Sequence, residues 1–241
     1  MRYRLAILDL EGTLVPEADD VVAAALAELG ASCGLAISAD EVRRRAGMNG
    51  AEIVRACLEV SLGRPASPGV VLHLEAELRR AMRDRAENYS GLRAAAGVSD
   101  LLTSLGVMGV AVGVVSGLDR RSVDALLDRF GWGVSVHHSI CADEVTEGRP
   151  SEAMIRAVMA KAGVRDAATV ASLGDSPNDL TAGLDAGCGM VACPASTRHL
   201  ARVESLAGVR MINAIADLAM AMGEAGAETE SPPQPSGRAN R

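Results

Sequence analysis

The sequence predicts an α/β protein, a Rossmann-like doubly wound parallel sheet that carries an inserted all-helical domain. Three observations predict this fold. An apolar run ends in an acidic residue at residues 5–10, helical patterns follow up to about residue 90, and strands alternate with helices from about residue 97 onward. Alternating strands and helices imply right-handed βαβ units, which build a parallel sheet.

The first strand, LAILDL at residues 5–10, is a continuous apolar run, which is typical of a strand covered on both faces. A single strand cannot bury both of its own faces. We therefore expect it to join the sheet of the later strands, which makes the helical block between them an insertion into one α/β core.

The inserted block contains four helical patterns separated by Gly and Pro breaks. These patterns are DDVVAAALAELGASCG, ADEVRRRAG, GAEIVRACLEVSLG and VVLHLEAELRRAMRDRAENY. We assign residues 16–90 to the inserted domain, and residues 1–15 and 91–222 to the core domain. The last stretch, 223–241, is polar and rich in Pro, Gly and Glu, and we expect it to be disordered.

Beyond the inserted block, amphipathic helical patterns and short apolar runs follow one another in strict alternation. The expected helices are residues 98–105, 120–130, 151–163 and 178–187, and the expected strands are residues 110–116, 134–140, 169–175 and 189–194. These runs are short enough for strands and are bounded by turn residues, so each pair of elements fits a βα unit.

The composition excludes several classes of partner. Hydrophobic residues make up 49% of the chain and aromatic residues only 2%, so a core can form but a base-stacking surface cannot. The net charge is −7 and basic runs such as residues 43–45 are short, which argues against nucleic acid. No apolar stretch is long enough to cross a bilayer, so no membrane partner is expected.

The cysteines and histidines show no metal-binding or disulfide pattern. The five cysteines are odd in number and lack CxxC spacing, which fits reduced thiols and a cytoplasmic location. The four histidines have no ligand spacing and are interpreted as structural: His73, His137, His138 and His199. The first apolar run lacks a small-residue cleavage site and is interpreted as a strand.

Polar side chains follow several of the expected strands. In open parallel sheets, ligands bind beyond the carboxyl ends of the strands, so these side chains are the first candidates for a site. The candidates are Asp9 with Glu11 and Thr13, Ser116 with Gly117, Arg149, and Asp175 with Asp179.

Four motifs that contain these residues resemble, in order, the four motifs of the haloacid dehalogenase superfamily. They are DLEGT (9–13), VVSG (114–117), EGRP (147–150) and GDSPND (174–179). One such motif alone is a weak signal, whereas four in the right order at strand ends are specific. The resemblance covers roughly residues 3–220 and implies the haloacid dehalogenase core with a helical C1 cap between the first two motifs.

The resemblance implies a magnesium-dependent phosphohydrolase. Asp9 would be the nucleophile that forms an aspartyl-phosphate, and Glu11 would be the general acid and base. The ligands of Mg²⁺ would be the side chains of Asp9 and Asp175 and the backbone carbonyl of Glu11, with Asp179 in support.

The same resemblance assigns residues that bind phosphate or substrate. Arg149 and Ser116 would hold the non-bridging oxygens in the transition state. Members of the superfamily usually carry Lys at the Arg149 position, but Arg keeps the charge. Thr13, Gly117 and, from the inserted domain, Asn49 complete the expected binding set.

Each assignment has an alternative that needs no catalysis. Asp175 and Asp179 could cap the helix that follows them, because Asp, Ser and Asn accept hydrogen bonds from free N–H groups at helix N-termini. Ser116 could likewise be an N-cap, Arg149 a surface charge, and Glu11 a brace for the turn before Gly12. Four unrelated caps would not reproduce one superfamily's motif order, which favours the catalytic interpretation.

Within the superfamily, three segments together look like the phosphonoacetaldehyde hydrolase group, which includes both carbon–phosphorus hydrolases and phosphatases. They are RAGMNGAEIVRACL (45–58), EGRPSEAMIRAVMAKAGV (147–164) and SLGDSPNDLTAGLDAG (172–187). The carbon–phosphorus hydrolases need a cap lysine that forms an imine with the substrate. The only lysine here, Lys161, lies outside the cap, and Asn49 and its neighbours occupy the expected place. Glu11 also replaces the Ala of those enzymes. Both departures favour a phosphatase that acts on a small phosphorylated metabolite.

Three alternatives stay open. The chain could be a phosphonoacetaldehyde hydrolase-type enzyme or a phosphomutase, which shares these motifs. It could also be a catalytically silent protein that binds a phosphorylated ligand, since fold does not determine function.

In the phosphatase interpretation, the cap would choose the substrate. We expect the protein to be a monomer or a homodimer.

Overall fold

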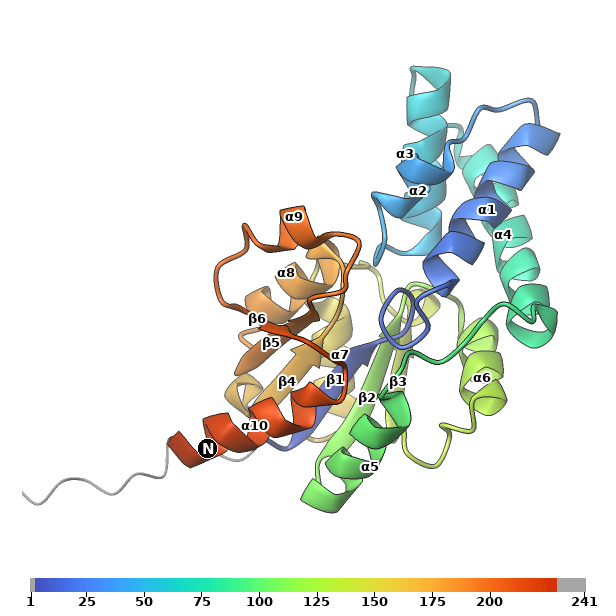
Figure 1. Ribbon diagram of the computed structural model, residues 1–241. Coiled ribbons are helices and arrows are strands. Elements are labelled where there is room, and N and C mark those ends of the chain that lie inside the picture. The colour runs from blue at the N-terminus through green and yellow to red at the C-terminus, as the bar shows by residue number, and fades with distance from the viewer. Residues whose placement is uncertain (1–2, 229–241) are drawn as a thin grey trace, which may run out of the picture.

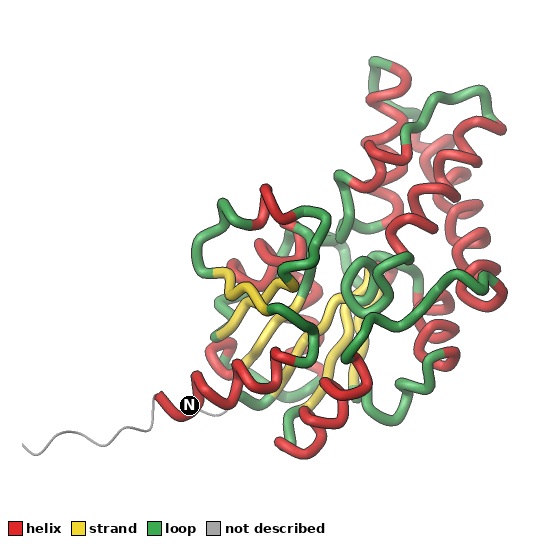
Figure 2. Tube along the Cα trace, viewed as in Figure 1, coloured by secondary structure: helices red, strands yellow, loops and turns green. Residues whose placement is uncertain are grey.

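A six-stranded parallel sheet forms the centre of the computed structural model, which describes residues 3–228 (Figures 1 and 2). The strand order is β3-β2-β1-β4-β5-β6, and each neighbouring pair is parallel. The strands are β1 (Leu5–Asp9), β2 (Ala111–Ser116), β3 (His138–Cys141), β4 (Val170–Leu173), β5 (Met190–Pro194) and β6 (Val209–Ile212). The order reverses between β1 and β4, which is where open sheets of this kind bind ligands.

Strand β1 is buried along its whole length, as its apolar sequence predicts. Ala6 and Leu8 belong to the main core cluster on one face of the sheet, whereas Leu5 and Ile7 pack in a second cluster on the other face. Successive side chains of a strand point to opposite faces, so a strand that is apolar at every position needs cover on both. The doubly wound fold predicted from the sequence is confirmed.

Helices cover both faces of this sheet. On one face, α5 (Val98–Met108) packs against α10 (Asp217–Glu228) and β2. On the other, α7 (Ala153–Lys161) packs against β1, β2, β3 and α8 (Pro177–Asp185). There are two further helices, α6 (Arg120–Arg129) and the short α9 (Leu200–Val203). They lie near opposite edges of the sheet (Figure 1). Two 3₁₀ turns, Ala142–Glu144 and Ala167–Thr169, precede α7 and β4.

The helical block lies beyond the carboxyl ends of the strands (Figure 1). It consists of α1 (Ala18–Ser32), α2 (Ala39–Arg43), α3 (Gly50–Leu62) and α4 (Pro68–Asn88), as the four sequence patterns predict. Here α1 packs against α2 and α4, α3 packs against α4, and α4 also packs against α6 of the core. We call α1 to α4 and their connections the cap; its boundaries at residues 16 and 90 stay a prediction.

Two element predictions were wrong. The strand expected at 134–140 begins only at His138, because Val134 is 95% exposed and the amides of Ser135 and Val136 both donate to Trp132 O at 2.9 Å, which makes a turn. The tail expected to be disordered from 223 is helical up to Glu228, as part of α10, and 229–241 lies outside the described residues.

The sequence patterns also missed β6, α9 and most of α10.

No helix in the described part of the chain combines the length and apolarity needed to span a bilayer. All five cysteines are free thiols, and Cys57, Cys141 and Cys193 are buried.

Candidate active site

The predicted acidic residues lie together where the strand order reverses. Asp9 is the last residue of β1, and Asp175 follows β4, the strand that pairs with β1. Asp9, Asp175, Asp179 and Glu11 are all more than nine-tenths buried. The fold thus brings four carboxyl groups from two motifs to one edge of the sheet, as the motif order predicts.

The turn after β1 is shaped by Gly12. Its φ of +82° is a conformation that side chains rarely adopt, and a Cβ there would lie 2.5 Å from Asp175 Oδ1. Glycine therefore lets the β1 turn approach the β4 loop directly. Thr13 Oγ1 then donates a hydrogen bond to Asp175 Oδ1 at 3.1 Å, so Thr13 positions an acidic side chain. Its predicted contact with phosphate stays a prediction.

Asp179 takes part in capping α8, which is one of the two roles considered for it, and its support of Mg²⁺ stays a prediction. Ser176 is the N-cap of α8, and the Asp179 carboxylate accepts hydrogen bonds from Ser176 N at 2.9 Å and Ser176 Oγ at 2.6 Å through Oδ2. This capping box fixes Asp179, and its Oδ1 faces Arg149 instead. Asp175 is not the cap of α8, so that alternative is wrong for Asp175.

Arg149 is a buried residue at the centre of the site, and the surface-charge alternative is wrong. It is 1% exposed, and its Nη1 contacts the carboxylates of both Asp9 and Asp179. Its Nε donates to Gly47 O of the cap at 2.7 Å. Nη2 is buried without a hydrogen-bond partner. A fixed guanidinium with a free donor is suited to bind an anionic oxygen.

Ser116 and Gly117 lie at the carboxyl end of β2, beside Glu11. Ser116 is fully buried, and its Oγ accepts a hydrogen bond from Leu118 N at 3.1 Å. The N-cap of α6 is Asp119, so the N-cap alternative for Ser116 is wrong. A Cβ at Gly117 would lie 2.5 Å from the carbonyl oxygen of Met48 and 3.4 Å from Glu11 Oε1, so the glycine lets the cap approach the core next to Glu11.

Burial and mutual repulsion raise the pKa values of these carboxyl groups. Desolvation first, and then Asp179, raise the pKa of Asp9 well above its usual value, while Arg149 opposes them. Desolvation and Asp179 raise the pKa of Asp175 to about 7. Desolvation also raises the pKa of Glu11. One buried guanidinium therefore faces more carboxyl groups than it can neutralise.

The acidic group fits a divalent cation. Oxygen atoms of Asp9, Asp175 and Asp179 lie within 4.8 Å of one another, and Asp9 Oδ2 is buried without a hydrogen-bond partner. Carboxylate oxygens at this spacing are the ligands that hard cations prefer. The cation would supply the positive charge that the buried carboxylates lack.

The connection between α2 and α3 reaches from the cap into this site. Besides the bond from Arg149 to Gly47 O, the carbonyl of Ala46 accepts hydrogen bonds from Asn178 Nδ2 at 2.7 Å and Ser176 Oγ at 3.3 Å. A cap backbone segment is thus hydrogen-bonded to three residues of the core motifs. The sequence signal for this segment was its resemblance to one enzyme group, and the contacts themselves could not be predicted.

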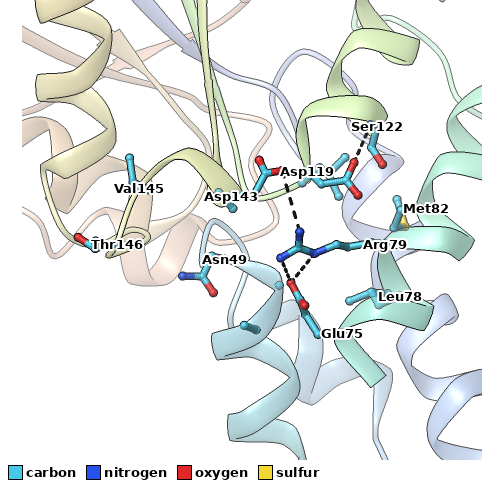
Figure 3. Close-up of a pocket in the computed structure, with 15 residues that line it drawn as sticks. Asn49, Glu75, Leu78, Arg79, Met82, Asp119, Ser122, Asp143, Val145 and Thr146 are labelled. Atoms are coloured by element: carbon cyan, nitrogen blue, oxygen red, sulfur yellow. Dashed lines mark hydrogen bonds and ion pairs between the residues drawn. The ribbon is translucent and has the colours of Figure 1, made fainter. Parts of the chain in front are cut away.

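A pocket of about 400 Å³ lies between the cap and the core (Figure 3). Leu78, Arg79 and Met82 of α4 line its cap side, and Leu118 and Asp119 line its core side. A smaller hollow lined by Glu11 shares four lining residues with this pocket, which are Gly50, Leu78, Gly117 and Leu118. The pocket therefore lies next to Glu11, on the side where Gly117 follows β2.

Two polar residues of this pocket are engaged within the protein. The Asn49 side chain accepts a hydrogen bond from Glu52 N at 2.9 Å and caps α3, although Asn49 also borders the pocket in Figure 3. Its predicted contact with substrate stays a prediction. Arg79 pairs with Glu75 and lies 4.0 Å from Asp143 Oδ2, so its charge is already compensated (Figure 3).

Sequence reasoning missed two residues of this region, Asp19 and His199. Oxygen and nitrogen atoms of Asp19, Asp175 and His199 lie within 4.8 Å of one another. Asp19 looks like one of two acids in the first turn of a helix, and His199 lacks any ligand spacing, so the sequence carried no signal for either. Their proximity depends on the fold.

Comparisons with known proteins find hydrolases and phosphatases among the relatives of this chain. The family model for haloacid dehalogenase-like hydrolases matches residues 3–187. Phosphoglycolate phosphatase 1 of Pseudomonas aeruginosa is 30% identical over 224 residues, which cover 89% of this chain and 78% of that protein. The N-acetylmuramic acid 6-phosphate phosphatase of the same species is 29% identical over 192 residues, which cover 78% and 80%.

Solved structures show the same fold. A phosphonoacetaldehyde hydrolase-like protein from Oleispira antarctica superposes with a TM-score of 0.78 at 18% identity and covers 96% of both chains. CbbY from Rhodobacter sphaeroides, in complex with phosphate, gives a TM-score of 0.74 at 21% identity and covers 90% of this chain and 96% of its own.

Proposed function

The chain belongs to the haloacid dehalogenase-like hydrolases, and we propose that it is a Mg²⁺-dependent phosphatase that transfers the phosphoryl group of a small-molecule monoester to Asp9. The proposal rests above all on one observation: the Asp9 carboxylate ends β1 beside Arg149 and within a three-carboxylate group that fits a cation. The phosphatases among the curated relatives support the same reaction class.

In the first half-reaction, an oxygen of Asp9 attacks phosphorus and the bond from phosphorus to the leaving oxygen breaks. The free Nη2 of Arg149 and the hydroxyl of Ser116 bind the non-bridging oxygens. Asp9 and Asp175, with Asp179 in support, would hold Mg²⁺, which neutralises their charge and stabilises the negative charge on the phosphoryl group.

Glu11 serves both half-reactions as the general acid and base. Burial raises the pKa of Glu11, which makes its carboxyl group better suited than a free glutamate to donate a proton to the leaving oxygen. The resulting carboxylate then accepts a proton from the water that attacks phosphorus. That attack breaks the bond to Asp9 and releases inorganic phosphate. Glu11 Oε2 is buried without a hydrogen-bond partner and is therefore free for these transfers.

The structure supports a phosphatase over a carbon–phosphorus hydrolase. Lys161, the only lysine of the chain, lies on α7 and donates to Ser139 O at 3.1 Å, and it does not line the pocket. Among residues 3–228, no lysine amine is therefore placed in this pocket to form an imine with a substrate aldehyde. Phosphonoacetaldehyde should not be cleaved, and borohydride should trap no adduct with it.

The pocket beside Glu11 would receive the leaving group. Arg79 is the one basic residue among the described residues that line it, and Glu75 already pairs with it. A small carboxylate such as glycolate would find no unpaired cation there. A pocket of about 400 Å³ also lies within the usual range for metabolite-sized ligands. We therefore favour a larger, hydroxyl-bearing leaving group, such as a sugar.

A phosphate-release screen tests the proposal. Sugar phosphates, phosphoglycolate and p-nitrophenyl phosphate would be assayed with Mg²⁺ and with EDTA. The expected result is turnover that EDTA abolishes and Mg²⁺ restores, with a higher kcat/KM for a sugar phosphate than for phosphoglycolate. Turnover that survives complete removal of metal would contradict the proposal. Transfer of phosphate to a second sugar, without release, would favour a phosphomutase.

A further inference from the structure

A second group of candidate metal ligands lies beside the first and comes from three separate parts of the fold. Asp19 is in the first turn of α1, Asp175 follows β4, and His199 follows β5 and precedes α9. One ligand atom of each lies within 4.8 Å of the others. The group shares Asp175 with the Asp9 site but contains an imidazole nitrogen, which the Asp9 site lacks.

Asp19 is buried and has an oxygen with no partner. The residue is 8% exposed, and its Oδ2 has no hydrogen bond. A Cβ placed on Gly12 would lie 2.7 Å from this oxygen and 2.5 Å from Asp175 Oδ1, so both carboxylates face the same space above Gly12. A buried carboxylate without a partner is expensive, and a bound cation removes that cost.

His199 completes the group and is held in place by its own loop. Its Nε2 is buried and also lacks a hydrogen-bond partner. Thr197 Oγ1 donates to Asp175 O at 2.7 Å and accepts from His199 N at 3.1 Å, which fixes the loop to the residue that both groups share. Arg198 pairs with Asp20 at 2.8 Å and so ties the same loop to α1.

We propose that Asp19, Asp175 and His199 form a second metal site that binds Zn²⁺, Co²⁺ or Mn²⁺ in preference to Mg²⁺. The preference follows from the donors, because imidazole nitrogen suits these cations whereas Mg²⁺ prefers oxygen ligands alone. A carboxylate has two oxygens, so Asp175 can serve both sites at once. An ion here would link the first turn of the cap to the β4 and β5 loops.

The test titrates the metal-free full-length chain with Co²⁺ while saturating Mg²⁺ occupies the Asp9 site. Binding is followed by visible absorption, which reports cobalt with a nitrogen ligand, and by metal counting after equilibrium dialysis. The expected result is one Co²⁺ per chain. His199→Ala should weaken this binding by at least about tenfold, because losing even a residue that only supports a metal ligand costs roughly 10- to 100-fold in affinity. The matched control is His73→Ala, which alters an exposed histidine of α4 and should bind as the unaltered chain does.

A second readout needs no variant and so does not depend on how a variant folds. In the unaltered chain, paramagnetic Co²⁺ should broaden the imidazole NMR signals of His199 at the first equivalent and leave those of His73 sharp. The proposal is overturned if Co²⁺ binds only by displacing Mg²⁺ from a single site, or if His199 is unaffected by the first equivalent. Mg²⁺-dependent phosphatase activity is measured separately, so either outcome leaves the proposed function testable.

Discussion

At the scale of single residues, the site depends on which buried charges face one another. The Nη1 of Arg149 contacts Asp9 and Asp179, and Asp175 is held by Thr13. These contacts fix the side chains before any ligand arrives. Such preorganisation is worth more than the same contacts in water, because the site is buried and its groups need little reorientation during the reaction.

Glu11 is the residue where the proposed chemistry can be separated from a structural role. Glu11→Gln should lower kcat for an alkyl phosphate by roughly 10²- to 10⁴-fold, the range of general acid–base catalysis. In the phosphorylation step p-nitrophenyl phosphate should suffer much less, because nitrophenolate leaves without a proton. Single-turnover kinetics with both esters measure this difference.

A structural brace would behave differently. If Glu11 only supports the turn before Gly12, both esters should lose the same factor and no phosphoenzyme should accumulate. Glu144→Gln is the control, because the Glu144 carboxylate accepts a hydrogen bond from Cys141 N and so supports a turn, but it lies outside the site, in the 3₁₀ turn after β3. That variant should keep the ratio of the two rates.

At the scale of elements, the connection between α2 and α3 joins the cap to the catalytic motifs. Gly47 has a φ of +82°, and its carbonyl accepts the hydrogen bond from Arg149 Nε. A Cβ on Gly47 would lie 2.8 Å from Asp179 Oδ1 and 2.9 Å from Ser176 Oγ. Only a residue without a side chain allows this approach of the cap to the core.

Gly47→Ala should therefore impair catalysis as well as stability. The left-handed conformation costs an alanine about 1–2 kcal/mol. The methyl group would also push the cap away from Asp179, and a displacement of about 1 Å can cost roughly 10²-fold in rate. The measurements are kcat/KM and the Tm of the variant.

Gly34→Ala is the matched control for this change. Gly34 has a φ of +72° in the connection between α1 and α2, but a Cβ there would meet nothing within 4 Å. It should lose similar stability and keep its kcat/KM. An equal loss of kcat/KM in both variants would show that the cap connection has no special role.

The elements that could be predicted from sequence are those with a strong local pattern. Strand β1 and the cap helices have continuous or periodic apolar residues. Strand β6 was missed because Arg210 and Met211 are exposed at an edge of the sheet, so the strand has no apolar run. Most of α10 was missed because its Gly and Glu residues resemble a linker, whereas packing against α5 stabilises it as a helix.

At the scale of the whole molecule, the site gathers residues that are far apart in sequence. Motif order was enough to predict that Asp9, Arg149 and Asp175 lie together, because each lies at or after the carboxyl end of a strand of one parallel sheet. The hydrogen bond between Arg149 and Gly47 joins the cap to these motifs, and the proximity of Asp19 and His199 brings a late loop next to the cap. No local pattern encodes such contacts, so they required the folded structure.

The excess of buried carboxyl groups should make the stability of the metal-free protein depend on pH. Burial raises the pKa values of Asp9, Glu11 and Asp19, and that of Asp175 to about 7, above the value of about 4 in unfolded chains. The folded state then holds more protons than the unfolded state between about pH 4 and pH 7. These groups therefore stabilise the fold most at low pH, and the contribution is lost as pH rises through this window.

Added Mg²⁺ should offset that loss, so its effect on Tm should be larger at about pH 8 than at about pH 5. Thermal unfolding with EDTA and with Mg²⁺ at both pH values measures the two metal effects. Contributions from groups that bind no metal are the same with and without Mg²⁺, so they cancel in each effect. A metal effect that is equal at both pH values, or larger in acid, would show that the carboxyl cluster is not the metal site.

The proposed mechanism requires that Asp9 becomes phosphorylated during turnover, and acid quenching followed by peptide mass mapping detects that phosphoryl group. The full-length chain is mixed with excess substrate and Mg²⁺ and quenched within one turnover. We expect one phosphoryl group on Asp9, none when EDTA replaces Mg²⁺, and none in Asp9→Asn, which should stay folded but inactive. A phosphoryl group on another residue, or substantial turnover by Asp9→Asn, would contradict it.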